Sequence, residues 1–218
     1  IMDIKQARKN VIEQQIRPWG GLNVRANQAL AEIPREKFVP EEYQKLVFAD
    51  IEIPLNGVDK MLSPKIEGRI LDCLNLQGNE EILEVGTGSG YLTSVLAKLS
   101  KSVQSIEIEK ELYESAKASI KKLKLKNVDL INDDFICSNF QEEEFDAIVI
   151  SSALTSIDED LKKLLKVGGS LFVVVGSKNH MHATIVSRSS KIDWQTKSLF
   201  ETRLEFMKGH EPVEQFSF

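Results

Sequence analysis

The chain has 218 residues, of which 42% are hydrophobic and 28% are charged, and its formal net charge at pH 7 is −5. These values are typical of a globular protein and exclude collagen-like, disordered and small disulfide-stabilised classes. With 28 Lys and Arg against 33 Asp and Glu, the chain has no net field that attracts nucleic acid or anionic lipid. No window approaches the roughly 20 apolar residues of a membrane helix, and Cys73 and Cys137 fit no metal or redox spacing. We therefore expect a cytoplasmic protein that binds neither nucleic acid nor membrane.

Residues 3–76 are predicted to form short helices separated by prolines. Apolar residues recur at helical spacing in the first stretch, at Ile4, Ala7, Val11, Ile12 and Ile16. Two further short helices are expected before Pro34 and after Pro40. Residues 50–59 have no clear periodicity and predict an irregular connection that forms a wall or a lid. A helix is expected to begin at Ser63-Pro64, because Ser is a favoured N-cap and Pro suits the first helical position.

From Glu81 onward, short apolar runs alternate with amphipathic stretches. The predicted strands cover residues 81–85, 103–108, 128–131, 147–150 and 171–175, and the predicted helices cover 91–99, 110–123 and 158–165. This alternation predicts a doubly wound, mostly parallel α/β sheet with helices on both faces. Residues 184–188 and 198–206 are predicted to form an antiparallel hairpin at the sheet edge. We expect a helical extension over residues 2–76 and a ligand-binding core over residues 77–218.

The sharpest motif is the glycine turn G-x-G-x-G at residues 86–90, between the first parallel strand and the next helix. Its glycines allow a tight turn and let a ligand approach main-chain N–H groups at the helix start. A dinucleotide-binding turn would place Gly or Ala at position 91, where this chain has Tyr91. The Gly-Lys-Ser/Thr of a triphosphate-binding loop is missing from the sequence too. The pattern favours a nucleoside-type ligand of another kind.

Acidic residues accompany the predicted carboxyl ends of three parallel strands. Glu84 precedes the glycines, Glu107 lies 17 residues after Gly90, and Asp133-Asp134 follow the third strand. Because ligands of such sheets bind at this edge, Glu107 is expected to accept the hydroxyls of a ribose, and one aspartate the amino group of adenine. A simple turn role for the two aspartates is equally favoured, since Asp is common in turns.

Residues 84–90 resemble the cofactor loop of the class I S-adenosylmethionine-dependent methyltransferases. Glu107 is similar to their ribose-binding acid and Asp134 to their adenine-side acid, while residues 145–149 and 165–169 resemble their fourth strand and the turn before their fifth. The resemblance implies a seven-stranded Rossmann-like methyltransferase sheet, with S-adenosyl-L-methionine as cofactor and S-adenosyl-L-homocysteine as product. The cofactor-binding residues that it implies are Glu84, Gly86, Thr87, Gly88, Gly90, Glu107, Ile108, Asp133, Asp134 and Ser151.

A narrower resemblance covers nearly the whole chain. Residues 33–40, 48–50 and 83–97, together with the segment before Pro64, look like the protein-L-isoaspartate O-methyltransferases, and residues 11–19 resemble a divergent bacterial branch of that family. The resemblance implies methylation of the carboxylate of L-isoaspartyl residues in damaged proteins, a repair reaction whose partners are peptides or proteins that carry such residues.

The chain departs from the family pattern on the substrate side. Where the family has Thr-Ile-Ser, one residue and Pro, this chain has Lys60-Met61-Leu62-Ser63-Pro64. Leu62 takes the place of the hydroxyl residue and Ser63 comes one residue late. We assign Met61, Leu62 and Ser63 to the catalytic, substrate-facing side, although an N-cap role for Ser63 is favoured over an inward one. A different protein or small-molecule substrate, or a cofactor-binding module without catalysis, are the alternatives.

Three further residues are assigned from their predicted positions. Ser151, just after the fourth strand, is expected either to face the methyl end of the cofactor or to cap a turn. His180 and His182 are expected to be surface residues of a loop without the partners that zinc requires, so no metal site is predicted.

Overall fold

The computed structural model describes residues 4–19 and 21–212. Its α-helices are α1 (Ile4–Asn10), α2 (Val24–Glu32), α3 (Pro64–Leu74), α4 (Tyr91–Leu99), α5 (Lys110–Lys122) and α6 (Glu159–Lys163). A π-helix, η1 (Val11–Ile16), and 3₁₀ helices η2 (Arg17–Trp19), η3 (Arg35–Lys37), η4 (Glu41–Leu46) and η5 (Phe135–Cys137) complete the helical segments. The strands are β1 (Ile53–Pro54), β2 (Lys60–Met61), β3 (Glu81–Val85), β4 (Ser102–Glu107), β5 (Val128–Asn132), β6 (Phe145–Leu154), β7 (Leu165–Ser177), β8 (His180–Arg188) and β9 (Trp194–Glu201).

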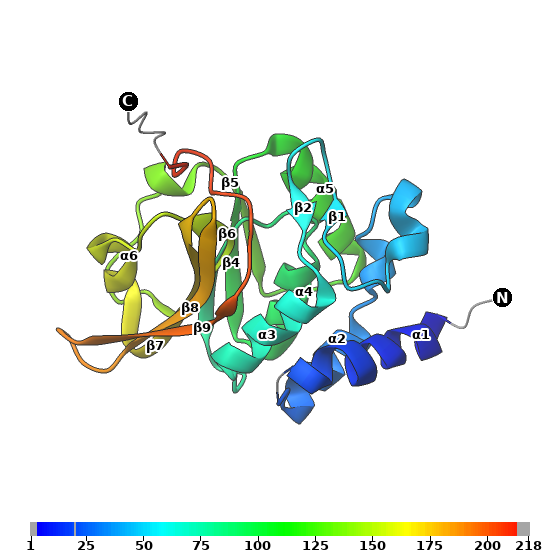
Figure 1. Ribbon diagram of the computed structural model, residues 1–218, viewed down its shortest axis with the longest axis horizontal. Helices are drawn as coiled ribbons and strands as arrows, with labels where there is room; N and C mark the ends of the chain where they lie inside the picture. Colours follow the sequence, from blue (N-terminus) through cyan, green and yellow to red (C-terminus); the bar gives the residue numbers. More distant parts are fainter. Residues whose placement is uncertain (1–3, 20, 213–218) are drawn as a thin grey trace. The chain divides into compact units, whose positions relative to one another are not determined.

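Seven strands form one mixed sheet in the order β5-β4-β3-β6-β7-β8-β9, and β1 and β2 form a small antiparallel sheet (Figure 1). Strands β3, β4 and β5 pair in parallel, as do β6 and β7, whereas β8 and β9 are antiparallel to their neighbours. The predicted α/β class, the mostly parallel sheet and the antiparallel C-terminal edge are confirmed. Continuous apolar runs such as Ile82-Leu83 are buried, as expected for strands covered on both faces.

By its internal contacts the chain divides into two compact units, one ending at Ser138 and the other beginning at Asn139. The first contains α1–α5 and β1–β5, and the second contains β6–β9 and α6. The predicted extension over residues 2–76 lies within the first unit, so the division at residue 76 stays a prediction. Residues 2–3 of the predicted extension and residues 213–218 of the predicted core lie outside the described residues.

Helix α2 begins where the sequence provides a cap. The Asn23 side chain accepts a hydrogen bond from the Ala26 N–H at 2.8 Å and so starts α2. The buried side of α2 carries Ala26, Ala29 and Leu30. Helices α2 and α3 pack against each other and against η1 (Figure 1), which buries Val11, Ile12 and Ile16 of the predicted apolar face. Ile4, at the start of the same predicted face, is 46% exposed.

In the second unit, β6 and β7 are longer than predicted, because bulges interrupt their pairing without ending it. The register passes from Phe145 opposite Leu165 to Ala147 opposite Ser170, so the predicted turn at residues 165–169 is an irregularity inside β7. A second shift between Val149 and Ala153 places Ser151 inside β6. The expectation that Ser151 follows the strand is therefore wrong.

The predicted C-terminal hairpin is present, but its second strand is placed differently. Strand β9 begins at Trp194 and ends at Glu201, and does not reach residue 206. Beyond it, the chain runs beside β6: the Ala153 N–H donates to the Glu205 carbonyl, and the Met207 N–H donates to the Ala153 carbonyl, both at 2.8 Å. These hydrogen bonds take the segment away from β8, which explains the earlier strand end.

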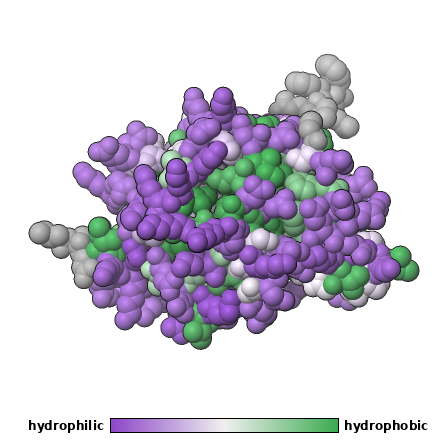
Figure 2. All heavy atoms as spheres, turned by 180° about the vertical axis from the view of Figure 1, so that it is seen from behind, coloured by the Kyte–Doolittle hydropathy of each residue, from purple (hydrophilic) through white to green (hydrophobic). Residues whose placement is uncertain are grey.

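The surface is dominated by hydrophilic side chains. On the face shown in Figure 2 they cover most of the area, and apolar groups gather near its middle. In the described part of the chain, no helix combines the length and the apolar character that crossing a lipid bilayer requires.

Gly90 is a position in the glycine turn where an added side chain meets both an unfavourable backbone conformation and close neighbours. It precedes α4 with a φ of +81°, and a Cβ there would lie 3.0 Å from the Ala116 Cβ and 3.1 Å from the Ile120 Cδ1 on α5. We expect Gly90→Ala to lower the free energy of unfolding by about 2–4 kcal/mol, measured by urea titration. Gly57→Ala is the control, because nothing lies within 4 Å of its added Cβ. Equal stability of the two variants contradicts the packing argument.

Candidate active site

The glycine turn connects β3 to α4 as predicted. Gly86, Gly88 and Gly90 have φ values of +93°, +53° and +81°, in the region that glycine adopts at little cost. The N–H groups of Gly86 and Thr87 both donate to the Ile106 carbonyl of β4, at 2.9 and 3.2 Å. These two hydrogen bonds therefore hold the turn against the neighbouring strand.

The carboxylate of Glu107, at the end of β4, contacts the turn directly. Its Oε2 accepts a hydrogen bond from the Gly88 N–H at 2.8 Å, and its Oε1 accepts one from the Glu109 N–H at 3.0 Å. The side chain is buried, and these two donors fix its orientation. The structure thus brings two predicted cofactor-binding residues together and presents an oriented carboxylate beside the glycine turn, the arrangement that ribose hydroxyls require.

Glu84 lies beneath the turn in a buried polar network. Its Oε2 accepts hydrogen bonds from the hydroxyls of Thr93 on α4 and Ser105 on β4. Because the Ser105 hydroxyl donates to Glu84, the 2.6 Å contact between Thr87 Oγ1 and Ser105 Oγ has Thr87 as donor. All four side chains are buried. The network connects β3, β4, α4 and the turn residue Thr87, a structural role that the sequence does not predict for Glu84.

One oxygen of this network has no hydrogen-bond partner: within the described residues, nothing contacts Glu84 Oε1 in that way although it is buried. Burial raises the pKa of Glu84 to about 7, while the two hydroxyls oppose the shift and the charge of Glu107 adds to it. A buried carboxyl with one unpaired oxygen is suited to accept a donor, because an unpaired buried polar atom costs free energy.

The two aspartates after β5 have the turn role that sequence analysis left open. Asp134 caps η5, its Oδ1 accepting the Ile136 N–H at 3.0 Å, and Asp133 Oδ1 accepts the Asp134 N–H at 2.8 Å. Asp133 is exposed and so is Ile108, at 43%. Their assignment to the adenine side stays a prediction.

The substrate-side segment is more regular than the sequence predicts. Strands β1 and β2 pair through Ile53 opposite Met61, and the Asn56 side chain accepts the N–H groups of Val58 and Asp59 in the turn between them. This turn is tight because an Asn oxygen replaces a backbone acceptor. A Cβ on Gly88 would lie 3.4 Å from Leu55 Cδ1, so the hairpin borders the glycine turn.

Met61, Leu62 and Ser63 are all buried where β2 leads into α3. Ser63 occupies the N-cap position, but its side chain makes no capping hydrogen bond. The carboxylate of Asp50 takes that role, with Oδ1 accepting the Lys65 N–H at 3.0 Å. The favoured interpretation of Ser63 as a capping side chain is therefore wrong, because a residue from a distant turn satisfies the helix start.

Arg35 is a site residue that sequence analysis did not single out. It is 3% exposed, pairs with the buried Glu67 of α3, and donates to the Leu62 carbonyl at 2.7 Å. Its guanidinium also lies 5.1 Å from the centre of the Tyr91 ring. Burial disfavours its charge, yet the charge and hydrogen bond of Glu67 leave the pKa of Arg35 above its usual value. The signal that could have identified Arg35 is a buried acidic partner. The sequence does not show that Glu67, in the first turn of a helix, is buried.

The remaining sequence-predicted residues lie in the second unit. Ser151 is half-buried on β6. His180 and His182 lie on β8, and the Glu201 carboxylate approaches His180 Nδ1 to 3.5 Å. The expectation of a loop position for the two histidines is therefore wrong, whereas the expectation of no metal site stays a prediction.

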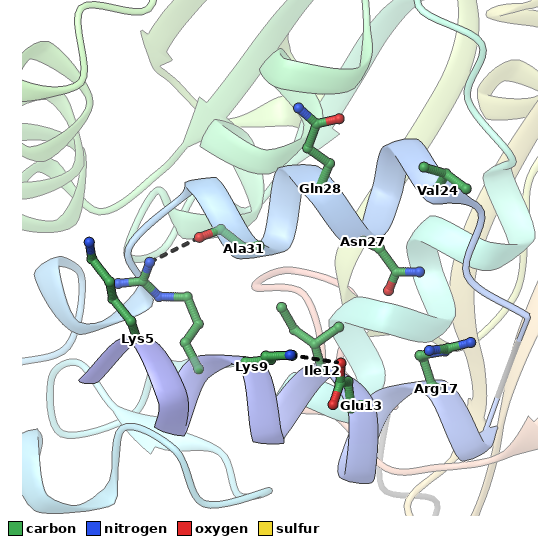
Figure 3. Close-up of a pocket in the computed structure, with 10 residues that line it drawn as sticks. Lys5, Lys9, Ile12, Glu13, Arg17, Val24, Asn27, Gln28 and Ala31 are labelled. Atoms are coloured by element: carbon green, nitrogen blue, oxygen red, sulfur yellow. Dashed lines mark hydrogen bonds and ion pairs between the residues drawn. The ribbon is translucent and has the colours of Figure 1, made fainter. Parts of the chain in front are cut away.

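A separate hollow of about 610 Å³ lies between the α1–η1 helix and α2 (Figure 3). Four cationic side chains line it, Lys5, Arg8, Lys9 and Arg17, and Glu13 forms a 3.8 Å ion pair with Lys9. None of the predicted site residues belongs to its lining.

Comparison with known proteins gives the same family as the motifs. Residues 6–205 match the sequence pattern of the family "Protein-L-isoaspartate(D-aspartate) O-methyltransferase". The chain belongs to this family. A relative from Dictyoglomus thermophilum, named protein-L-isoaspartate O-methyltransferase, is 36% identical over 83% of this chain and 82% of its own length. One of the same name from Syntrophus aciditrophicus is 34% identical, with 86% of each chain covered.

Solved structures of the same name confirm the fold. A crystal structure of a Plasmodium falciparum protein assigned to the family, in complex with S-adenosyl-L-homocysteine, has a TM-score of 0.80 at 20% identity, covering 94% of this chain and 98% of that one. A second structure named protein-L-isoaspartate O-methyltransferase also has a TM-score of 0.80, at 21% identity, with 93% of this chain and 65% of that chain covered. The family members therefore share this sheet and its helices.

Removing one partner of the buried ion pair should destabilise the family fold more than removing both. Arg35→Met leaves Glu67 buried without a counter-charge and should cost about 3–5 kcal/mol of unfolding free energy, whereas Arg35→Met with Glu67→Leu should recover most of it. Lys101→Met, which breaks an exposed pair with Glu81, is the control and should cost less than about 1 kcal/mol. Urea unfolding measures all three, and a double variant no more stable than Arg35→Met contradicts the prediction.

The raised pKa of Glu84 predicts a pH-dependent stability. Between its ordinary value of 4.5 and its folded value of about 7, the folded chain binds a proton that the unfolded chain lacks. This contribution is complete below pH 4.5 and is lost as the pH rises through 7. Glu84→Gln does not titrate, so its stability relative to the unchanged protein should improve by on the order of 3 kcal/mol from pH 4.5 to pH 8. Urea unfolding at both pH values measures the difference in unfolding free energy between the two proteins. A difference that is the same at both pH values contradicts the prediction.

Proposed function

We propose that this chain transfers the methyl group of S-adenosyl-L-methionine to the free carboxylate of L-isoaspartyl residues in peptides and proteins, as the name of its family states. The products are the methyl ester and S-adenosyl-L-homocysteine, and the biological role is repair of damaged proteins. The proposal rests on one observation above the others: backbone bonds to Ile106 hold the G-x-G-x-G turn against β4, and the oriented Glu107 carboxylate lies beside it.

The described residues fit the cofactor. Glu107 is the proposed acceptor of the ribose hydroxyls, and the backbone of residues 86–90 is the proposed contact for the methionine portion. Glu84 Oε1 offers a buried acceptor without a partner for a donor bound above it, directly or through an ordered water. Ile108, Asp133 and Asp134 are the proposed adenine side, and Ser151 the proposed methyl side. When bound, the cofactor supplies a methyl group already activated by its sulfonium.

The residues of this chain then act by alignment. A carboxylate acceptor is ionised at neutral pH, so no side chain has to remove a proton from it. What remains is to hold the acceptor in line with the methyl group and to exclude water. Buried Met61 and Leu62 provide an apolar wall, and Ser63, whose hydroxyl makes no capping bond, is the proposed hydrogen-bond donor to the acceptor. Arg35 positions this wall by holding the Leu62 carbonyl.

The direct test is a labelled-methyl transfer assay with an isoaspartyl peptide and the same peptide carrying normal aspartate. We expect a base-labile methyl ester on the isoaspartyl peptide alone. Label on both peptides, or on neither, contradicts the proposed substrate.

Loss of the Glu107 carboxylate should weaken cofactor binding. We expect Glu107→Ala to raise the dissociation constant of S-adenosyl-L-methionine by about tenfold or more, the cost of losing charge-assisted hydrogen bonds. Glu111→Ala removes an exposed carboxylate from α5 and is the matched control. Calorimetry measures both, and equal affinities reject Glu107 as a ligand.

Leu62 favours a second candidate function, methylation of a different acceptor. A buried apolar side chain stands where the family resemblance places a hydroxyl. If the acceptor differs, the unchanged protein should have no isoaspartyl activity for Ser63→Ala to reduce, and Leu62→Ser should create that activity. If the isoaspartyl proposal holds, Ser63→Ala should reduce kcat by at least about tenfold, as expected for removing one hydrogen-bond donor from a reacting group.

A further inference from the structure

Strand β8 carries two histidines that the proposed methyl transfer does not use. His180 and His182 are two residues apart on one strand, so both side chains project from the same face of the sheet. His182 is the register partner of Glu201 on β9. Directly opposite residues on antiparallel strands hold their Cβ atoms about 5 Å apart. Three side chains with metal-binding atoms are therefore brought together by strand pairing alone.

The distances between the ligand atoms of this cluster are slightly longer than those in a metal-bound site. One ligand atom from each of His180, His182 and Glu201 lies within 4.8 Å of the others, and His180 Nδ1 lies 3.5 Å from Glu201 Oε1. The two imidazole rings are stacked, with centroids 6.2 Å apart and an angle of 9° between their planes. Ligands of a tetrahedral zinc ion at 2.0–2.1 Å are separated by about 3.4 Å. Small side-chain rotations reach that spacing, and the exposed side chains of His180 and Glu201 are free to make them.

We propose that His180, His182 and Glu201 bind a transition-metal dication of the Zn²⁺ type. Two imidazoles with one carboxylate suit zinc, copper or nickel, whereas magnesium and calcium prefer oxygen ligands alone. Three protein ligands leave a fourth position for water or an external group. The scaffold is rigid, because β8 is hydrogen-bonded to β7 on one side and to β9 on the other.

The surroundings determine what the fourth position accepts. A hollow of about 390 Å³ lies beside the cluster, with Glu201 in its wall together with Lys178 and Arg203. These cations weaken the attraction for a dication and favour an anionic fourth ligand. We therefore expect an accessible site with an exchangeable ligand, weaker than a closed structural zinc site. The cluster is independent of the glycine turn and does not rest on the proposed methyl transfer.

Zn²⁺ titration of the full-length, tag-free protein tests the site. Calorimetry should show one Zn²⁺ bound per chain. His182→Ala should weaken binding by at least about tenfold, since even the loss of a residue that only supports a metal ligand costs that much. His210→Ala is the matched control, because the chain has only three histidines and His210 lies outside the cluster. No heat with the unchanged protein, or equal affinities of the unchanged protein and His182→Ala, overturns the proposal.

A second variant separates ligation from general surface charge. Glu201→Gln keeps the size of the side chain and should also weaken Zn²⁺ binding, while circular dichroism and thermal unfolding report whether each variant keeps the fold. Mg²⁺ in place of Zn²⁺ should give no measurable binding. Mg²⁺ affinity equal to that of Zn²⁺, or a Glu201→Gln variant that binds Zn²⁺ like the unchanged protein, contradicts the three-residue site.

Discussion

The hydrogen bonds of the buried Glu84 carboxyl are the interaction on which the rest of the site depends. They join two strands and the following helix, and through Ser105 they reach Thr87 in the turn itself. A glycine-rich turn has little conformational preference of its own, so its shape has to come from its surroundings. Here the backbone bonds to Ile106 and this network supply it. This arrangement leaves one buried oxygen of Glu84 without a hydrogen-bond partner, which costs free energy. A ligand that donates a hydrogen bond to this oxygen would remove that cost.

The segment proposed for the substrate side is likewise held by contacts from residues distant in the sequence. Asp50 starts α3, and Arg35 of η3 holds the Leu62 carbonyl, so residues distant in the sequence position the short segment that differs from the family pattern. Because Asp50 caps the helix, the Ser63 hydroxyl is not committed to that role. The departure at Leu62 therefore changes a side chain of the proposed substrate wall, while Arg35 still holds the Leu62 carbonyl.

Sequence analysis predicted the elements whose causes are local. Strand β3 and helix α4 have the predicted bounds, since a buried apolar run, three glycines and an apolar helix follow one another without competing signals. Bulges inside β6 and β7 were not predictable, because the residues around them favour turns and only pairing with a neighbouring strand keeps them extended. The same holds for Ser63, whose local preference for capping is overridden by a carboxylate 13 positions earlier.

The sequence by itself determined the α/β class, the glycine turn and the choice of Glu107 as its acidic companion, because hydrophobic periodicity and glycine spacing act over a few residues. Tertiary packing was needed to show that Arg35 pairs with Glu67, that Glu84 lies in a buried hydrogen-bonded network, and that Glu201 stands beside two histidines. Most of these contacts join side chains about 20 or more positions apart, and the shortest, from Thr93 to Glu84, spans nine positions. Their proximity comes from strand register and helix packing, which no local pattern encodes.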